Sequence, residues 1–254
     1  MSVNVAAAGP VTTITLDRPE VMNAFDDAGA ARIADAVSAA VEETSCRVIV
    51  MTGAGRGFCA GADLGCLREI VAARNHDRAR DLVTSAARIV RIIVSAPKPV
   101  IAAVNGPAAG GGASLALACD LRIASSAASI GAVFTRIGLH PDLGATYLLP
   151  LLAGFGRAME LVLTGDMVPA VEAHRIGLFN RVVPPDALAA ETHALARTLA
   201  ERSPTALART KLSMHAAVSG TLGDALAREL THQLALIDTD EVREALLKTP
   251  KSTR

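Results

Sequence analysis

Short runs that are β-branched or wholly apolar alternate with longer amphipathic segments through the first half of the chain. The runs typical of strands cover residues 11–16, 47–52, 98–104 and 120–124. The second run, RVIVMT, is almost continuously apolar, as expected for a strand that is covered on both faces. Apolar residues recur at helical spacing after Asp26 and over about residues 77–96 and 111–118. A strand, a glycine turn and a helix thus repeat three times, which predicts an α/β fold.

The last part of the chain changes character, because no strand pattern interrupts it. Two sets of leucines each follow a helical spacing: Leu188, Leu195 and Leu199, then Leu222, Leu226, Leu230 and Leu234. We therefore expect a core over residues 1–185 and a helical region over residues 186–254, with Pro184 and Pro185 marking the boundary. The amphipathic helices are expected to dock either on their own core or on a neighbouring subunit.

Composition and charge exclude several classes of protein. The 254 residues include 25 Lys+Arg and 25 Asp+Glu, so no net basic field attracts nucleic acid. Hydrophobic residues make up 51 % of the chain, which excludes disorder, and no apolar run reaches the roughly 18 residues that a membrane span needs. The start of the chain has no signal-like segment, so its four cysteines are expected to be free thiols of a cytoplasmic protein.

Two glycine-rich clusters follow predicted strands, and neither fits a nucleotide-binding motif. TGAGRGFCAGADL (residues 52–64) has Phe58 where a dinucleotide fingerprint needs glycine. NGPAAGGGASLALACD (residues 105–120) has no lysine to complete a phosphate-binding loop, and Ser114 lacks the closing glycine of a nucleophile elbow. The six histidines show no metal-binding spacing, so we expect no metal site.

Such turns can still present backbone N–H groups to a ligand, because glycine lets the backbone approach closely. Gly111 is expected at the N-terminus of a helix, where free N–H donors and the helix dipole favour negative charge. Two donors aimed at one oxygen would form an oxyanion hole. The alternative is that these glycines serve only to form tight turns.

Five ordered motifs resemble the crotonase, or enoyl-CoA hydratase/isomerase, superfamily. They are LDRPEVMNAF (16–25), GFCAGADL (57–64), KPVIAAVNGPAAGGGASLALACDLRIAS (98–125), GLHPDLGATYLLP (138–150) and LTGDMVPAVEAHRIGLFNRVVP (163–184). The resemblance implies a spiral of repeated ββα units with a C-terminal helical region, assembled as a homotrimer or a dimer of trimers. It also implies an acyl-CoA substrate, with coenzyme A as part of that substrate and no separate cofactor.

The resemblance assigns site residues by position. It implies that the amides of Ala62 and Gly111, the latter beside Gly110 in the glycine run, bind the thioester oxygen. The residues implied for the wall on the CoA side are Val21, Ala60, Gly61, Asp63 and Leu64, with Lys248 as a weaker candidate for the CoA phosphates.

The chain departs from the hydratase pattern at both catalytic glutamates of that pattern, where it has Ser114 and Phe134. Asp142 occupies a third position that some isomerases of the superfamily use; a turn-forming role after Pro141 is the alternative. Phe134 and Leu139 are expected to form an apolar acyl pocket and to raise the pKa of Asp142 by desolvation. Ser114 is expected to line the pocket or to bind water.

Three functions follow from this pattern. The first is an enoyl-CoA isomerase that uses Asp142 as its acid and base, since one carboxylate can carry out both proton transfers. The second is an enoyl-CoA hydratase that uses Asp142 and a bound water. The third is a non-catalytic acyl-CoA-binding protein that has kept the oxyanion hole and lost its acids.

Overall fold

A six-stranded sheet organises the chain, and a computed structural model describes residues 1–248 of it, without the side chain of Lys248. The strand order is β1-β2-β3-β4-β6-β9; β1 is antiparallel to β2 and all other neighbours are parallel. The strands of this sheet are β1 (Ser2–Ala8), β2 (Val11–Asp17), β3 (Val48–Gly53), β4 (Val100–Val104), β6 (Leu121–Ser125) and β9 (Arg181–Val183). A smaller sheet contains β5 (Ala108–Ala109), β7 (Ser129–Gly131) and β8 (Val168–Pro169).

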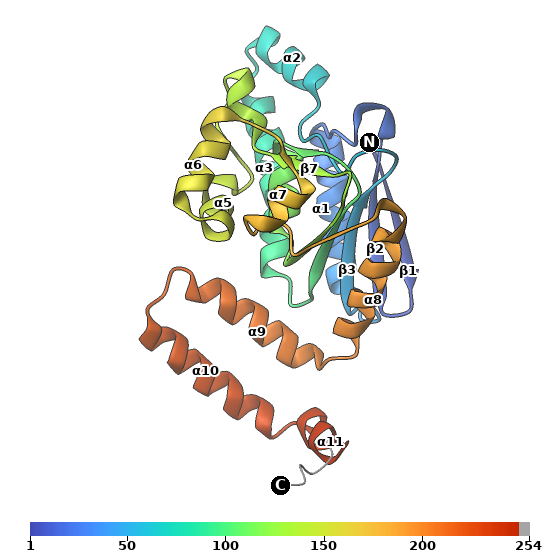
Figure 1. Ribbon diagram of the computed structural model, residues 1–254, viewed down its shortest axis with the longest axis vertical. Helices are drawn as coiled ribbons and strands as arrows, with labels where there is room; N and C mark the ends of the chain where they lie inside the picture. Colours follow the sequence, from blue (N-terminus) through green and yellow to red (C-terminus); the bar gives the residue numbers. More distant parts are fainter. Residues whose placement is uncertain (249–254) are drawn as a thin grey trace.

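Helices surround the main sheet and continue past it (Figure 1). The α-helices are α1 (Asp27–Glu42), α2 (Leu64–Ala73), α3 (His76–Ser95), α4 (Gly111–Ala118), α5 (Ala145–Ala153), α6 (Phe155–Thr164), α7 (Ala170–Arg175), α8 (Leu188–Ala200), α9 (Pro204–Ala217), α10 (Leu222–Ile237) and α11 (Asp240–Lys248). Three short 3₁₀ helices are η1 (Pro19–Val21), η2 (Val133–Ile137) and η3 (Pro185–Ala187).

The central strands are buried on both faces because alternate residues enter two separate hydrophobic clusters. In β3, Ile49 and Met51 pack in the cluster that contains α1, α3 and α4, whereas Val48 and Val50 pack in the cluster that contains α8. This arrangement explains the continuous apolar run in the sequence. The carboxyl ends of β3 and β4 lead directly into the two glycine-rich turns, which places both turns at one edge of the sheet.

The last three helices extend away from the body of the molecule, whereas α8 packs on the sheet (Figure 1). One connection back to the body is Lys211 of α9, whose Nζ donates to the carbonyl oxygens of Ile93 (2.7 Å) and Lys98 (3.1 Å) and pairs with Asp120 at 2.8 Å. The helical region predicted from residue 186 thus contains two parts: α8, which packs on the sheet, and α9 to α11, which project from it.

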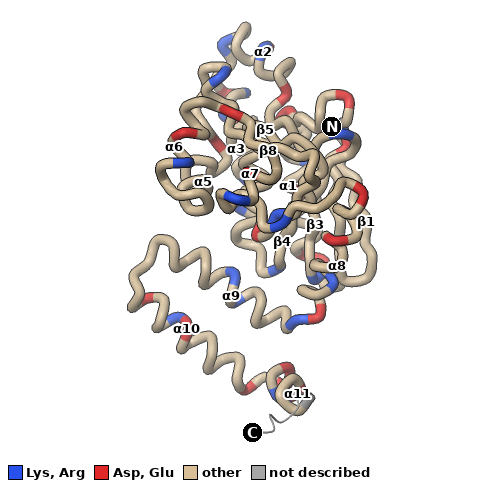
Figure 2. The backbone as a smooth tube through the Cα atoms, viewed as in Figure 1, with Lys and Arg blue, Asp and Glu red and all other residues tan. Residues whose placement is uncertain are grey.

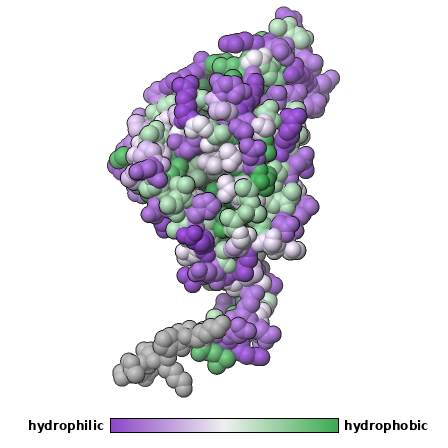
Figure 3. Space-filling view, turned by 90° about the vertical axis from the view of Figure 1, so that its right-hand side faces the viewer, coloured by the Kyte–Doolittle hydropathy of each residue, from purple (hydrophilic) through white to green (hydrophobic). Residues whose placement is uncertain are grey.

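The leucine face of α10 does not cap the chain's own core, which was one of two expected arrangements. The exposed fractions are 76 % at Leu222, 56 % at Leu226, 62 % at Leu230 and 58 % at Leu234. Hydrophobic patches are visible both on the body and on the projecting end of the chain (Figure 3). An amphipathic helix without a partner on its apolar side is typical of a surface that another polypeptide covers.

Charged residues of both signs are interspersed along the described chain, without a long block of one sign (Figure 2). Among the helices of residues 1–248, none combines the length and the hydropathy needed to cross a bilayer.

Candidate active site

A cavity of about 1700 Å³ opens at the edge of the sheet where the two glycine-rich turns lie. Its walls come from the loop before α1, from α2 and α3, from the turn before α4, and from η2 with the loop that follows. Two helical faces line it at regular spacing: Leu64, Leu67, Arg68 and Val71 of α2, and Ala79, Leu82, Val83 and Ala86 of α3. Most of this lining is apolar, which suits an apolar ligand group.

Two buried asparagines hold the first glycine turn. Asn23 is fully buried, and its Nδ2 donates to the carbonyl oxygens of Ala54 (2.9 Å), Gly57 (2.9 Å) and Phe58 (3.1 Å). From the other side, Nδ2 of Asn105 donates to the carbonyl of Gly57 at 3.1 Å. Because these carbonyls are satisfied inside the protein, the turn is fixed in position.

The N–H of Ala62 is directed by the hydrogen bonds of its own peptide unit. The carbonyl of Gly61 accepts from the amide of Phe25 at 2.9 Å, and the amide of Asp63 donates to the carbonyl of Phe25 at 2.8 Å. In a trans peptide the N–H points opposite to the C=O, so the Ala62 N–H points away from Phe25. Ala62 lines the cavity, and within the described residues its N–H has no protein acceptor.

The second free amide begins α4. Gly110 caps this helix with φ of +54°, and its carbonyl accepts from the amide of Ser114 at 3.0 Å. The N–H of Gly111 belongs to the first turn of the helix and has no protein acceptor in the described chain. Gly110 and Gly111 both line the cavity, so the positive end of the α4 dipole faces it.

The two turns are in contact at Gly61 and Gly111. Gly61 has φ of +86°, and a methyl group on it would lie 2.7 Å from the nitrogen of Gly111 and 3.0 Å from the carbonyl oxygen of Ala109. Only glycine fits this contact. The unpaired amides of Ala62 and Gly111 therefore belong to two touching turns that line the same cavity. Two such donors aimed at one oxygen atom would form an oxyanion hole.

Asp142 is a half-buried carboxylic acid that lines the same cavity. Its Oδ1 is buried and has no hydrogen-bond partner. Burial is the main cause that raises the pKa of Asp142 to about 6, and the nearby His140 opposes part of this rise. Phe134 and Leu139 line the cavity with it, as expected from the sequence.

Ser114 lies behind the wall of this cavity and does not line it, which corrects one of its two expected roles; that it binds water stays a prediction. Its hydroxyl donates to the carbonyl oxygens of Asp142 (3.1 Å) and Gly110 (3.3 Å), and its exposed fraction is 1 %. The physical reason is its place one turn into α4, on a helix that is buried on every side. Ser114 therefore connects the loop of Asp142 to the helix that carries Gly111.

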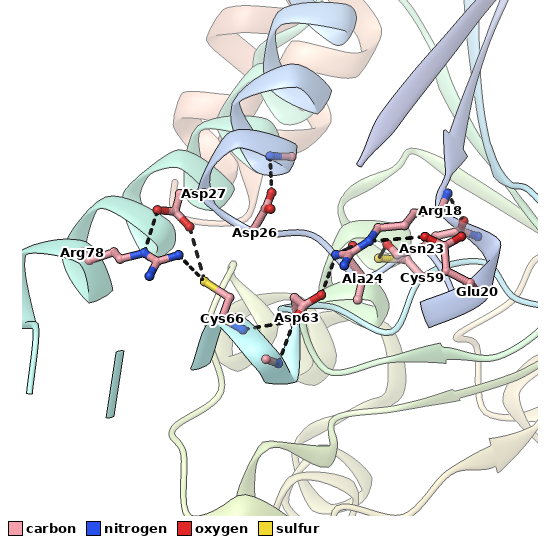
Figure 4. A network of polar contacts seen from close by, with 12 residues as sticks. Arg18, Glu20, Asn23, Ala24, Asp26, Asp27, Cys59, Asp63, Cys66 and Arg78 are labelled. Carbon is pink, nitrogen blue, oxygen red and sulfur yellow. Dashed lines mark hydrogen bonds and ion pairs between the residues drawn. The ribbon is translucent and has the colours of Figure 1, made fainter. Parts of the chain in front are cut away.

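Asp63 also lines the cavity, but its carboxylate is already occupied (Figure 4). It caps α2 by accepting from the amides of Gly65 (2.6 Å) and Cys66 (3.0 Å), and it forms an ion pair with Arg18. These backbone hydrogen bonds, together with Arg18, lower the pKa of Asp63. Asp63 thus stabilises the first turn of α2.

The other residues predicted for the CoA side fall into three groups. Val21, Ala60 and Leu64 line the cavity, whereas Gly61 packs against Gly111 behind its surface. Lys248 ends α11, and its side chain lies outside the described residues.

The sequence did not predict the cavity-lining cations Arg68, Arg74 and Arg136, nor the face of α3 that lines the cavity. The helical spacing of residues 79, 82, 83 and 86 was the available signal for that face.

Comparison with known proteins gives the same family as the motifs. The enoyl-CoA hydratase/isomerase family model matches residues 7–250. The chain belongs to the enoyl-CoA hydratase/isomerase family. It is 40 % identical over 243 residues to 1,2-epoxyphenylacetyl-CoA isomerase of Escherichia coli K12, covering 93 % of this chain and 90 % of that protein. It is also 37 % identical over 215 residues to crotonyl-CoA hydratase of Syntrophomonas wolfei, covering 84 % and 80 % of the two chains.

Solved structures confirm the crotonase fold that the motifs predicted. The enoyl-CoA hydratase of Bacillus anthracis superposes with a TM-score of 0.91 at 35 % identity, covering 97 % of this chain and 95 % of the other. The chain is thus a crotonase-type enzyme, and its family includes both isomerases and hydratases.

The raised pKa of Asp142 also predicts an effect on stability. Because the folded-state pKa of about 6 lies above the ordinary value of 3.8, ionisation of Asp142 disfavours the folded state. The protonated form is favoured below about pH 4, and this advantage is lost as the pH rises through about 6. We expect Asp142→Asn to raise the melting temperature relative to the wild type at pH 8 and to leave it nearly unchanged at pH 4. Scanning fluorimetry at both pH values checks this, and equal shifts at both would contradict it.

Proposed function

We propose that this enzyme moves the double bond of an enoyl-CoA, with Asp142 as the single acid and base. The observation that carries the proposal is the number of free carboxylates. Within the described part of the chain, Asp63 and Asp142 are the acidic residues that line the cavity, and Asp63 is held by Arg18 and by the cap of α2. One carboxylate is enough to shuttle a proton between two carbons, whereas hydration also requires a positioned and activated water.

In the proposed reaction, Asp142 removes a proton from C2 of a 3-enoyl-CoA, and the C–H electron pair moves toward the thioester carbonyl. The resulting dienolate carries its negative charge on the thioester oxygen, which the amides of Ala62 and Gly111 stabilise. The protonated Asp142 then returns the proton to C4, which shifts the double bond to C2–C3 and regenerates the carboxylate. No net oxidation occurs, and no group other than the proton is transferred.

The cavity supports an apolar acyl group attached to a phosphate-bearing carrier. Phe134, Leu139 and Leu82 provide apolar surface in the cavity that Asp142 also lines. Arg68 of α2 and Arg74, which follows the helix, are exposed residues that line the cavity and suit the phosphates of coenzyme A. We propose that coenzyme A enters as part of the substrate and that the reaction uses no further cofactor or metal.

The exposed leucine face of α10 supports self-association. We propose that the enzyme works as a homotrimer or a dimer of trimers in the cytoplasm, with this face covered by a neighbouring subunit. Light scattering coupled to gel filtration measures the mass in solution, and a monomer at micromolar concentration would contradict this part of the proposal.

Product analysis tests the proposed reaction. The purified enzyme is incubated separately with a 3-enoyl-CoA and a 2-enoyl-CoA, and the products are separated by liquid chromatography with mass detection. Conjugated 2-enoyl-CoA from the first substrate, without a mass change, is expected. Formation of only 3-hydroxyacyl-CoA from the second substrate would instead indicate a hydratase. Tight binding of both compounds without turnover would indicate a non-catalytic acyl-CoA-binding protein.

The pKa of Asp142 also predicts the pH dependence of isomerisation. A base must be ionised to accept a proton, so kcat should rise with pH through about 6 and reach a plateau above it. Below that value kcat should fall about tenfold for each pH unit, as expected for a single titrating group. Initial rates between pH 4.5 and 8.5 measure this profile. A kcat that stays nearly constant down to pH 4.5, as expected for a base with the ordinary pKa of 3.8, would show that the catalytic base is not desolvated.

A further inference from the structure

Cys59 lies between the loop of Asn23 and the amide proposed to bind the thioester oxygen. Its thiol is fully buried. The thiol donates to the carbonyl oxygen of Asn23, with Sγ 3.2 Å from that oxygen, and Sγ accepts from the amide of Gly61 at 3.3 Å. The close-up view shows Cys59 beside Asn23 (Figure 4). The thiol therefore joins the loop of Asn23 to the turn of Gly61, as donor to the first and acceptor from the second.

The backbone of Cys59 connects the same turn to the start of α4. The amide of Ala109 donates to the carbonyl of Cys59 at 2.9 Å, and a methyl group on Gly112 would lie only 2.0 Å from that carbonyl oxygen. One residue thus contacts three segments: the loop of Asn23, the turn of Gly61, and the turn that leads to Gly111. The free amides of Ala62 and Gly111 belong to the last two segments.

We propose that Cys59 is a positioning residue for the oxyanion hole. Its sulfur accepts from the N–H of Gly61, and the peptide bond that follows Gly61 carries the N–H of Ala62. This inference rests on the proposed function. Gly61 is restrained at both ends, by the sulfur at its N–H and by the amide of Phe25 at its carbonyl. With both ends held, the peptide that joins Gly61 to Ala62 cannot rotate freely. Burial raises the pKa of the Cys59 thiol to about 12, so the thiol keeps the proton that it donates.

Two substitutions separate positioning from simple packing. Cys59→Ala removes the donor and the acceptor and leaves the Asn23 carbonyl and the Gly61 amide unpaired in a buried place. Cys59→Ser restores a side chain that can donate and accept at the same position. Cys46→Ala is the matched control, because Cys46 is a buried thiol that donates to the carbonyl of Val48 and does not line the cavity. It precedes β3, at the end of the strand opposite to the glycine turn.

The readouts are kcat, KM and the thioester carbonyl stretch of a bound saturated acyl-CoA labelled with ¹³C at C1. For Cys59→Ala we expect kcat to fall between about 10- and 100-fold, with KM changed less than about threefold, because small displacements of a transition-state donor are costly. The red shift of the carbonyl band on binding should shrink in this variant. Cys59→Ser should recover both kcat and the band shift, and Cys46→Ala should keep wild-type values.

The outcomes distinguish this inference from the proposed function. If the wild type shifts the carbonyl band and Cys59→Ala shifts it equally, with unchanged kcat, Cys59 does not position the amide. If Cys59→Ala loses only melting temperature, its role is packing, and the inference is also wrong. If the wild type itself neither shifts the band nor turns over enoyl-CoA, the proposed function has failed, and the inference fails with it.

Discussion

Replacing Asp142 with alanine is expected to lower kcat for 3-enoyl-CoA isomerisation by about 10³-fold, while acyl-CoA affinity changes little. The reason is that the remaining cavity carboxylate within the described residues, that of Asp63, is bound to Arg18 and to the backbone of α2. The Asp63 carboxylate could act as a base only by breaking its ion pair with Arg18 and the hydrogen bonds that cap α2. Steady-state kinetics and calorimetric titration with a saturated acyl-CoA measure the two quantities.

Two further variants sharpen this test. Asp142→Asn keeps the size of the side chain but cannot accept the proton, so it should be as inactive as the alanine variant. Asp35→Ala removes an exposed acidic residue that pairs with Arg88 on the surface, and it should keep wild-type kcat. Unchanged turnover in both Asp142 variants would remove this residue from the mechanism.

Gly61→Ala is expected to lower kcat by at least about 100-fold, since it would disturb both proposed oxyanion donors together. The added methyl group would lie 2.7 Å from the nitrogen of Gly111, and the backbone at residue 61 has φ of +86°, which alanine adopts poorly. Relief of this clash has to move the turn of Ala62 away from α4. Kinetics at saturating substrate measure the loss.

Gly9→Ala is the matched control for the backbone strain. Gly9 also has positive φ, at +59°, but a methyl group there meets nothing within 4 Å. This variant should lose some stability and retain its activity. If Gly61→Ala also keeps full activity while remaining folded, the contact between the two glycine turns has no role in catalysis.

The apolar pattern of the sequence predicted elements whose apolar residues are buried in the core. The run at residues 47–52 became β3, the segment at about 77–96 became α3, and the segment at about 111–118 became α4. β1 was missed because its residues are exposed along nearly the whole strand, and the short alternation of Ser2 to Val5 ends in a run of three alanines, which have low strand propensity. α2 was missed because it starts within a glycine-rich stretch, although the Asp63 cap and the helical spacing of Leu64, Leu67 and Val71 both indicate a helix there.

The candidate site was predictable where a family motif fixes a backbone position, as at Ala62 and Gly111. It was less predictable where the direction of a side chain decides whether a residue lines the cavity. Ser114 shares a helix with Gly111, yet it faces the carbonyl of Asp142 and not the cavity. The ion pair that occupies Asp63 joins residues 45 positions apart, which no local pattern reveals. Desolvation of Asp142 likewise depends on several segments that meet only in the folded chain.

A crystal structure of the enzyme with a non-isomerisable acyl-CoA bound is the most direct measurement of the proposed mechanism. We expect the thioester oxygen within about 2.7–3.2 Å of the nitrogens of both Ala62 and Gly111, with a carboxylate oxygen of Asp142 next to C2. A thioester oxygen that contacts neither amide, or a C2 atom beyond the reach of Asp142, would contradict it.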